Sequence, residues 1–145
     1  MNQESGSTVK AANSARVRIV IGPLVGPVLG RVVAMLAARA DCPVDRLDDA
    51  LLVVDTLAAH SAEHVPDGRV TMNVSSRAGE LELRLGPLVA PGGQAILERA
   101  AIPGLGNVLE RVSDSISVQE GEDGTQTLLI GLRFAVGASS PSGRG

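Results

Sequence analysis

Residues 45–85 read DRLDDALLVVDTLAAHSAEHVPDGRVTMNVSSRAGELELRL and decide the fold class of this chain. In the first half, apolar and small side chains recur at helical spacing from Leu47 to Val65, and Pro66-Asp67-Gly68 ends the pattern. In the second half, residues 69–75 and 80–85 alternate polar and apolar side chains on either side of a short turn, which indicates a β-hairpin. A long amphipathic helix followed by an antiparallel hairpin predicts helices packed on one face of a sheet.

The residues before this stretch predict one strand and one more helix. Residues 16–21 alternate charged and β-branched side chains, which predicts a half-buried strand that ends at Gly22-Pro23. A first helix is predicted from about Val25 to Ala40, with an apolar stripe of Leu24, Val28, Val32, Met35 and Leu36. Asp41 or Asp45 is expected to cap the second helix, whose stripe consists of Leu47, Leu51, Val54, Ala58, Ser61 and Val65. In the hairpin, we expect Leu81, Leu83 and Leu85 to face the core.

The residues after this stretch predict a loop, two short helices and a second hairpin. We expect a loop over residues 88–93, helices over 94–101 and 103–112, and strands over 115–119 and 125–136. The order β-α-α-β-β-α-α-β-β predicts the α/β (α+β) class. We therefore expect a two-layer α/β sandwich, with helices on one face of a mixed, mainly antiparallel sheet.

Length and composition predict one domain with short tails. The chain has 145 residues, which is the size of a single domain with one core. Residues 1–14 and 137–145 are rich in Ser, Gly and Asn or Pro, so we expect disordered tails around a domain at 15–136. Phe134 is the only aromatic residue, so the core must consist of Leu, Val, Ile and Ala.

Charge and hydropathy exclude several classes of function. The net charge is −3, Lys10 is the only lysine, and the arginines form no basic stripe, which argues against a nucleic-acid partner. The most apolar run, residues 19–30, is interrupted by Pro and Gly and is shorter than the roughly 20 residues that span a bilayer, so no membrane segment is expected. Cys42 is the only cysteine, so an intramolecular disulfide is impossible and a cytoplasmic location is expected.

A family resemblance rests on several short sequence motifs and on their order along the chain. They are Val53-Val54-Asp55 on the second helix, Gly86-Pro87-Leu88 after the third strand, and Pro103-Gly104-Leu105-Gly106 followed by Leu109-Glu110-Arg111-Val112-Ser113-Asp114. Together they resemble the histidine-kinase-like ATPase family, and more narrowly the bacterial anti-sigma regulatory serine kinases of the partner-switching type. The resemblance covers about residues 17–134. It implies that fold, a sigma factor or an anti-sigma antagonist as partner, and the possibility of a homodimer.

The resemblance also implies a nucleotide pocket, whose polar residues differ here. In the family the second helix carries a Glu that activates water and an Asn that holds magnesium; the matching positions are Thr56 and His60, and His64 matches a histidine common in the family. Spacing of four residues predicts that these three side chains share one helical face. Threonine is no general base, and imidazole is a poor ligand for magnesium. The adenine-binding Asp is also missing, because Arg84-Leu85-Gly86-Pro87 occupies its place.

Glycines remain as the other pocket candidates. Gly104 and Gly106 are expected to open a helix and could present backbone N–H groups to phosphate, or they could simply allow a tight helix entry. Arg99 is the only basic residue in the lid-like segment 89–103. The predicted nucleotide-pocket residues are therefore Thr56, His60, His64, Gly86, Gly104 and Gly106, with no catalytic residue, no bound cofactor, and weak or lost binding of ATP and magnesium.

A second motif suggests a different chemistry. Residues 60–64 read His-Ser-Ala-Glu-His and match H-x-x-E-H, in which two histidines one turn apart bind zinc and the Glu activates water. Glu98 and Glu110 are the only candidates for a third ligand.

The sequence leaves three hypotheses. The first is an anti-sigma-like regulatory protein that acts by protein–protein binding, without catalysis. The second is an active serine kinase of an anti-sigma antagonist, with Asp55 supplying the missing carboxylate after a shift in helix phase. The third is a zinc peptidase.

Overall fold

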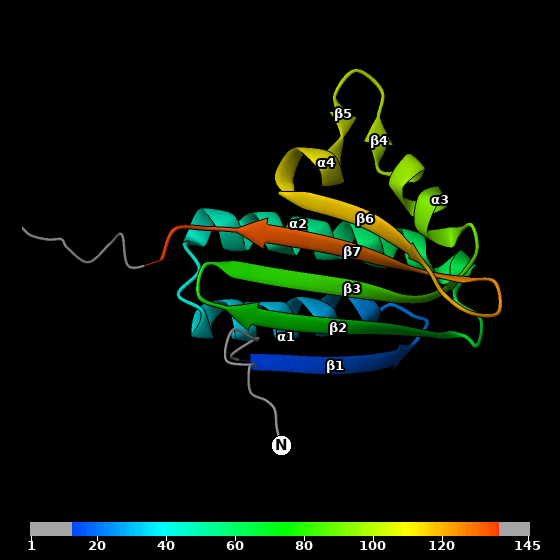
Figure 1. The fold of residues 1–145 in the computed structure, drawn as a ribbon, viewed down its shortest axis with the longest axis horizontal. Helices are drawn as coiled ribbons and strands as arrows, with labels where there is room; N and C mark the ends of the chain where they lie inside the picture. The colour runs from blue at the N-terminus through cyan, green and yellow to red at the C-terminus, as the bar shows by residue number, and fades with distance from the viewer. Residues whose placement is uncertain (1–12, 137–145) are drawn as a thin grey trace, which may run out of the picture.

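A five-stranded antiparallel sheet forms one layer of the protein in this computed structural model, which describes residues 13–136 (Figure 1). In spatial order the strands are β1 (Asn13–Val20), β2 (Arg69–Arg77), β3 (Glu80–Val89), β7 (Thr125–Arg133) and β6 (Ser115–Glu120). All neighbouring strands are antiparallel, so the predicted mixed sheet is wrong. The two successive helices between β1 and β2 bring the chain back to the end of the sheet where β1 finished. β2 therefore runs antiparallel to β1.

Four helices and a small hairpin form the second layer, on one face of the sheet (Figure 1). They are α1 (Val25–Arg39), α2 (Val44–Ser61), α3 (Gly92–Arg99) and α4 (Val108–Val112), with a 3-10 turn, η2 (Ala62–His64), after α2. The hairpin consists of β4 (Ala101–Ile102) and β5 (Gly106–Asn107) and projects beyond the sheet (Figure 1). Among residues 13–136, no helix is long and apolar enough to cross a bilayer.

The boundaries of several elements differ from the predicted ones. β1 begins at Asn13, two residues inside the predicted N-terminal tail; the remaining tail predictions, for residues 1–12 and 137–145, lie outside the described residues. β3 extends to Val89 into the predicted loop, and α4 begins at Val108 instead of Pro103. Neither predicted aspartate caps α2: its N-cap is Pro43, while Asp41 has a positive φ in the helix connection and Asp45 lies in the first turn.

The core lies between the sheet and the helices, but α1 turns a different face toward it than predicted. Of the predicted α1 stripe only Leu36 is buried, whereas Leu24, Val28 and Met35 are 64%, 37% and 55% exposed. The buried residues of α1 are Val25, Leu29, Val33, Leu36 and Ala37. Because α1 is apolar on nearly every side, spacing alone defines more than one stripe. In the sheet, Leu81, Leu83 and Leu85 are buried, as predicted.

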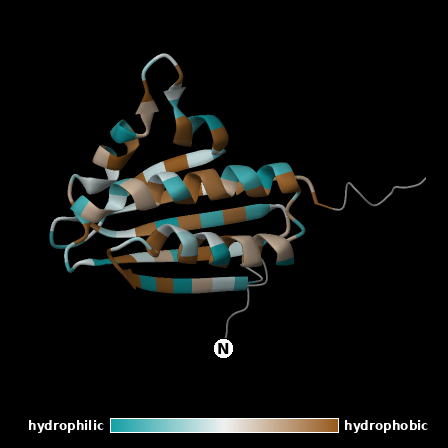
Figure 2. Ribbon diagram, turned by 180° about the vertical axis from the view of Figure 1, so that it is seen from behind, coloured by the Kyte–Doolittle hydropathy of each residue, from teal (hydrophilic) through white to brown (hydrophobic). Residues whose placement is uncertain are grey.

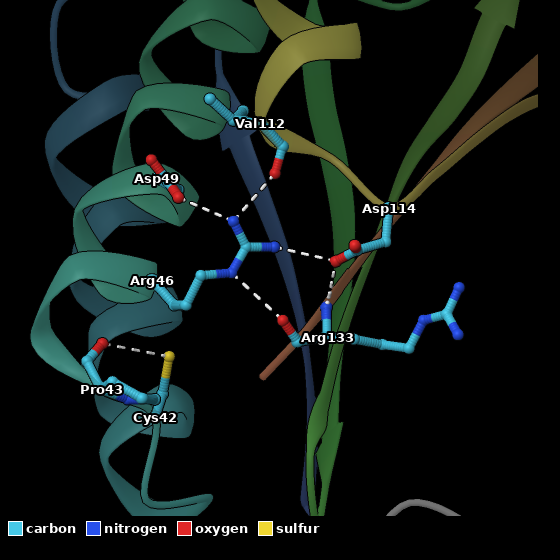
Figure 3. A network of polar contacts seen from close by, with 7 residues as sticks. All are labelled: Cys42, Pro43, Arg46, Asp49, Val112, Asp114 and Arg133. Carbon is cyan, nitrogen blue, oxygen red and sulfur yellow. Dashed lines mark hydrogen bonds and ion pairs between the residues drawn. The ribbon is translucent and has the colours of Figure 1, made fainter. Parts of the chain in front are cut away.

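Arg46 joins α2 to the ends of α4 and β7 (Figure 3). Its guanidinium donates to Asp49 Oδ2 at 2.7 Å and to Asp114 Oδ2 at 2.8 Å. It also donates to the carbonyl oxygens of Val112 and Arg133, both at 3.1 Å. Asp114 Oδ2 accepts a further hydrogen bond from the Arg133 backbone N–H at 2.5 Å. One side chain therefore satisfies backbone and carboxylate oxygens from three separate elements.

Candidate functional site

A hollow of about 260 Å³ lies beside α2, and we call it the α2 pocket. It is lined by Asp55, Thr56, Ala59 and His60 of α2, Arg99 and Ala100 from the end of α3, Ile102 of β4 and Val108 of α4. Two of the predicted nucleotide-pocket residues, Thr56 and His60, thus share one hollow. Their spacing of four residues places them on one face of α2, as predicted. The hollow is smaller than the roughly 300–1,000 Å³ of typical small-molecule sites.

The hydroxyl of Thr56 donates a hydrogen bond within its own helix. Thr56 Oγ1 donates a hydrogen bond of 2.8 Å to the carbonyl oxygen of Leu52, one turn earlier. A hydroxyl that donates its proton to its own helix offers a pocket ligand only its lone pairs. Because a neutral hydroxyl oxygen is a far weaker base than a carboxylate, Thr56 cannot replace the general base in this pocket.

His64 does not line the α2 pocket with Thr56 and His60. The α-helix ends at Ser61, and residues 62–64 form a 3-10 turn with about three residues per turn, which changes the direction of the following side chains. His64 instead packs against Gly92 at the start of α3: a Cβ added to Gly92 would lie 2.8 Å from the Cβ of His64. His64 is a packing residue between η2 and α3.

The zinc-protease motif lacks the helix that its geometry needs. Two histidines four residues apart face each other only when one continuous helix carries both. Here the helix ends between His60 and His64, and Glu63 lies 3.5 Å from the guanidinium of Arg99. No group of three or more His, Cys, Asp or Glu side chains that could hold a metal is found within residues 13–136, Glu98 and Glu110 included.

Gly86 lies at a close contact between β3 and β7. A Cβ at this position would lie 2.8 Å from Thr127 Oγ1 and 3.0 Å from the carbonyl oxygen of Gln126. The β3–β7 register shifts between Leu85 and Leu88, which places Gly86 in this irregularity. Leu85 is buried, and Arg84 lies on the open face of the sheet. The glycine is therefore required by close strand packing.

Gly104 and Gly106 form the turn of the β4–β5 hairpin and do not open a helix. Their φ values are +82° and +86°, and a Cβ at either position would meet nothing within 4 Å. The Leu105 N–H donates to the carbonyl oxygen of Ile102 at 2.9 Å, which closes a β-turn. α4 begins after them and is capped by Asn107, whose side chain accepts from the Glu110 N–H. Neither glycine lines the α2 pocket.

A larger hollow, of about 770 Å³, lies on the outer side of the helical layer, and we call it the α1/α2 groove. It is lined by Gly26, Pro27, Gly30, Arg31, Val32, Ala34 and Met35 of α1 and by Leu51 and Asp55 of α2. Both glycines lie at the contact between the two helices, where a Cβ on Gly26 would be 3.7 Å from Ala58 Cβ and one on Gly30 would be 3.7 Å from Leu51 Cδ2, an ordinary van der Waals distance. Figure 2 views the molecule from this helical side.

Sequence reasoning missed the groove because it assigned its residues to the core. The available signal was the excess of apolar residues in α1, which is larger than one buried face requires. Asp55 lines both the α1/α2 groove and the α2 pocket. The two hollows therefore meet at one exposed carboxylate.

No protein-family model matches the chain, and a search of curated proteins finds no significant match. The resemblance to the histidine-kinase-like ATPases stays an interpretation of the sequence.

Proposed function

We propose that this chain is a regulatory protein of the anti-sigma type with the histidine-kinase-like ATPase fold, which binds another protein through its helical layer and binds ATP weakly or not at all. The observation that carries the proposal is the α1/α2 groove. Met35, which lines the groove, is 55% exposed, and Leu24 before α1, Val28 of α1 and Leu52 of α2 are 64%, 37% and 44% exposed. Exposed apolar surface of this kind is typical of contacts with a partner.

The chemistry of the groove favours a protein segment as its occupant. Its floor is made of glycine, alanine and aliphatic side chains, and its two charged residues, Arg31 and Asp55, carry opposite signs. Aliphatic contacts would supply affinity, while the two charges would orient a bound helix or strand. We infer a sigma factor or an anti-sigma antagonist as the partner, and a second copy of the chain is the alternative occupant.

The α2 pocket supports the second half of the proposal. Thr56 donates its proton to Leu52, and a neutral hydroxyl is a poor base in any case. His60 offers an imidazole where magnesium prefers oxygen ligands. At the place of the family's adenine-binding Asp the chain has a buried Leu85 and no carboxylate. Each of these differences removes a polar contact that a nucleotide would need.

The experiment has two parts. Titration of labelled ATP with magnesium is expected to show no saturable binding in the micromolar range, and micromolar binding that Thr56→Ala or His60→Ala abolishes would overturn the proposal. In parallel, purified sigma factors and antagonists are tested for binding. Met35→Asp and Leu52→Asp should each weaken the complex at least tenfold, because each places a charge in an apolar contact.

A matched control distinguishes specific binding at the groove from nonspecific hydrophobic association. Leu105 is 61% exposed at the tip of the β4–β5 hairpin, far along the chain from the groove residues. Leu105→Asp should leave partner binding unchanged within twofold. If it weakens binding as much as Met35→Asp does, the helical layer is not the binding surface.

An active serine kinase is the second candidate, because Asp55 and Arg99 both line the α2 pocket. A carboxylate could accept the proton of a substrate hydroxyl, and a guanidinium could contact phosphate. Transfer of radiolabel from ATP to a purified antagonist, lost in Asp55→Asn, would support the kinase. No transfer across a panel of antagonists would count against it.

A further inference from the structure

A second charged hollow lies on the face of the sheet that the helices leave open. It has a volume of about 160 Å³ and is lined by Arg16 and Arg18 of β1, Arg69 and Thr71 of β2, Asp67 of the preceding turn, and Pro87 of β3. We call it the arginine hollow. Its lining residues place it where β1 ends and β2 begins, two strands that Figure 1 shows side by side at one edge of the sheet.

The pairing of β1 with β2 gathers these arginines. In β1 the exposed residues Arg16 and Arg18 alternate with Val17 and Ile19, which pack against the core. Because side chains alternate between the two faces of a strand, both arginines project from the open face. Arg18 lies opposite Thr71 in the register, and Arg69 lies opposite Val20. Side chains about fifty positions apart in the sequence thus converge on one hollow.

The charges in the hollow are unbalanced. It holds three guanidinium groups and one carboxylate, Asp67, which is already paired with Arg18 and also accepts the Arg69 backbone N–H at 3.2 Å. Within residues 13–136, Arg16 and Arg69 have no carboxylate at ion-pair distance. The hydrogen bond from Arg18 lowers the pKa of Asp67, so this carboxylate stays ionised at neutral pH and the lining residues carry a net charge of about +2.

We propose that the arginine hollow is a binding site for the phosphate group of a phosphate monoester or of free phosphate. A phosphate monoester carries a charge of about −1.5 to −2 at neutral pH, which balances the hollow, whereas a carboxylate would leave a positive charge unpaired. The planar guanidinium forks of Arg16 and Arg69 can each donate two hydrogen bonds to phosphate oxygens. The hydroxyl of Thr71 adds a neutral donor.

The size of the hollow agrees with this ligand. Its volume equals that of about five water molecules at ~30 Å³ each, which suits the five heavy atoms of a phosphate group and excludes a whole nucleotide. The hollow also lies on the opposite face of the sheet from the α2 pocket and the α1/α2 groove. It is therefore independent of the function proposed for the helical layer, and either proposal can fail alone.

The test is a ³¹P NMR titration of inorganic phosphate against the full chain at low ionic strength. Saturable line broadening is expected in the millimolar range. Arg16→Gln and Arg69→Gln should each weaken binding by about tenfold, because each removes charge-assisted hydrogen bonds. Asp67→Asn should tighten binding severalfold, because it removes the one carboxylate among the lining residues and keeps one side-chain oxygen, which can still accept from the Arg69 N–H.

Arg84→Gln is the matched control, since Arg84 lies on the same face of the sheet but is paired with Glu82 at 3.6 Å. It should change binding by less than twofold. The proposal is overturned by an absence of saturable binding, by equal losses in Arg84→Gln and Arg16→Gln, or by weaker binding in Asp67→Asn. A cooperative thermal unfolding transition well above the assay temperature in each variant confirms that the fold is intact.

A second arm of the titration distinguishes the source of the phosphate group. The ligand is a short Gly/Ser peptide with one phosphoserine, compared with its unphosphorylated form. Binding of the phosphopeptide more than tenfold tighter than inorganic phosphate would support a phosphorylated protein as ligand. Equal binding of both would support a free phosphate or a small ester, and binding of the unphosphorylated peptide with the same affinity would refute a phosphate site.

Discussion

Replacing Arg46 by alanine is expected to destabilise the protein by about 2–3 kcal/mol. The guanidinium of Arg46 donates to Asp49, Asp114 and the carbonyl oxygens of Val112 and Arg133. Its side chain is 21% exposed, and those of the two aspartates are 34% and 38% exposed. Partly exposed ion pairs contribute about 0.5–1 kcal/mol each, and hydrogen bonds to backbone oxygens about as much. The truncation also leaves Asp49 and Asp114 without their common counter-charge.

This loss should be visible in the melting temperature. For a domain of this size, 1 kcal/mol corresponds to about 3–5 °C, so the midpoint should fall by about 6–15 °C. Circular dichroism during heating and urea titration measure the change independently. Arg46→Lys is expected to recover less than half of the loss, because an ammonium cannot reach four acceptors in the geometry of the guanidinium fork.

Arg31 of α1 supplies the control, because it is exposed and has no ion pair within the described part of the chain. Arg31→Ala should change the free energy of unfolding by less than about 0.5 kcal/mol. In a double-mutant cycle, Arg46→Ala and Asp114→Ala should show a coupling of about 1 kcal/mol. If Arg46→Ala costs no more than Arg31→Ala, the network does not hold α2 to the sheet and the reasoning is refuted.

Three further predictions concern packing and titration. Gly92→Ala should destabilise the fold by about 1–3 kcal/mol in urea, because its Cβ would lie 2.8 Å from that of His64; an unchanged midpoint would refute this packing. The hydrogen bond from Arg18 lowers the pKa of Asp67, so its stabilisation is present above pH ~4 and is lost as pH falls through the folded pKa. Acid titrations should therefore show a smaller loss of stability in Asp67→Asn than in the wild type. Burial raises the pKa of the Cys42 thiol, so iodoacetamide at pH 7.5 should alkylate it more slowly in folded than in urea-unfolded protein; equal rates would contradict this.

Patterns that repeat every two residues predicted the strands and both large hairpins correctly. The segments that became β2, β3, β6 and β7 alternate polar and apolar side chains and are joined by turn residues, so their structure depends on neighbours close in sequence. The segregation of helices to one face follows from the order of the elements. The sequence pattern did not predict that every strand pair is antiparallel. The direction of β2 relative to β1 depends on the end of the sheet to which the two intervening helices return the chain.

For the candidate site, a spacing of four residues predicted which side chains lie together only for residues within the same α-helix. Thr56 and His60 meet in the α2 pocket because both lie within α2, whereas His64 lies beyond the end of the α-helix. Gly104 and Gly106 were expected at the entry of a helix, and in the structure both have positive φ values. The same residues turn a hairpin instead of opening a helix, because glycine allows a positive φ in either setting.

By itself the sequence determined the order of the helices and of the strands of the main sheet, their periodicity and the near absence of aromatic residues, because these depend on local spacing and composition. Only the tertiary structure decided which side of the apolar helix α1 is buried, since that choice depends on the fit of α1 against the sheet and α2. Only strand pairing brought Arg16 and Arg69 into one hollow, and only packing placed Arg46 among oxygens from α4 and β7. These features are contacts between residues far apart in the chain, and no local pattern encodes them.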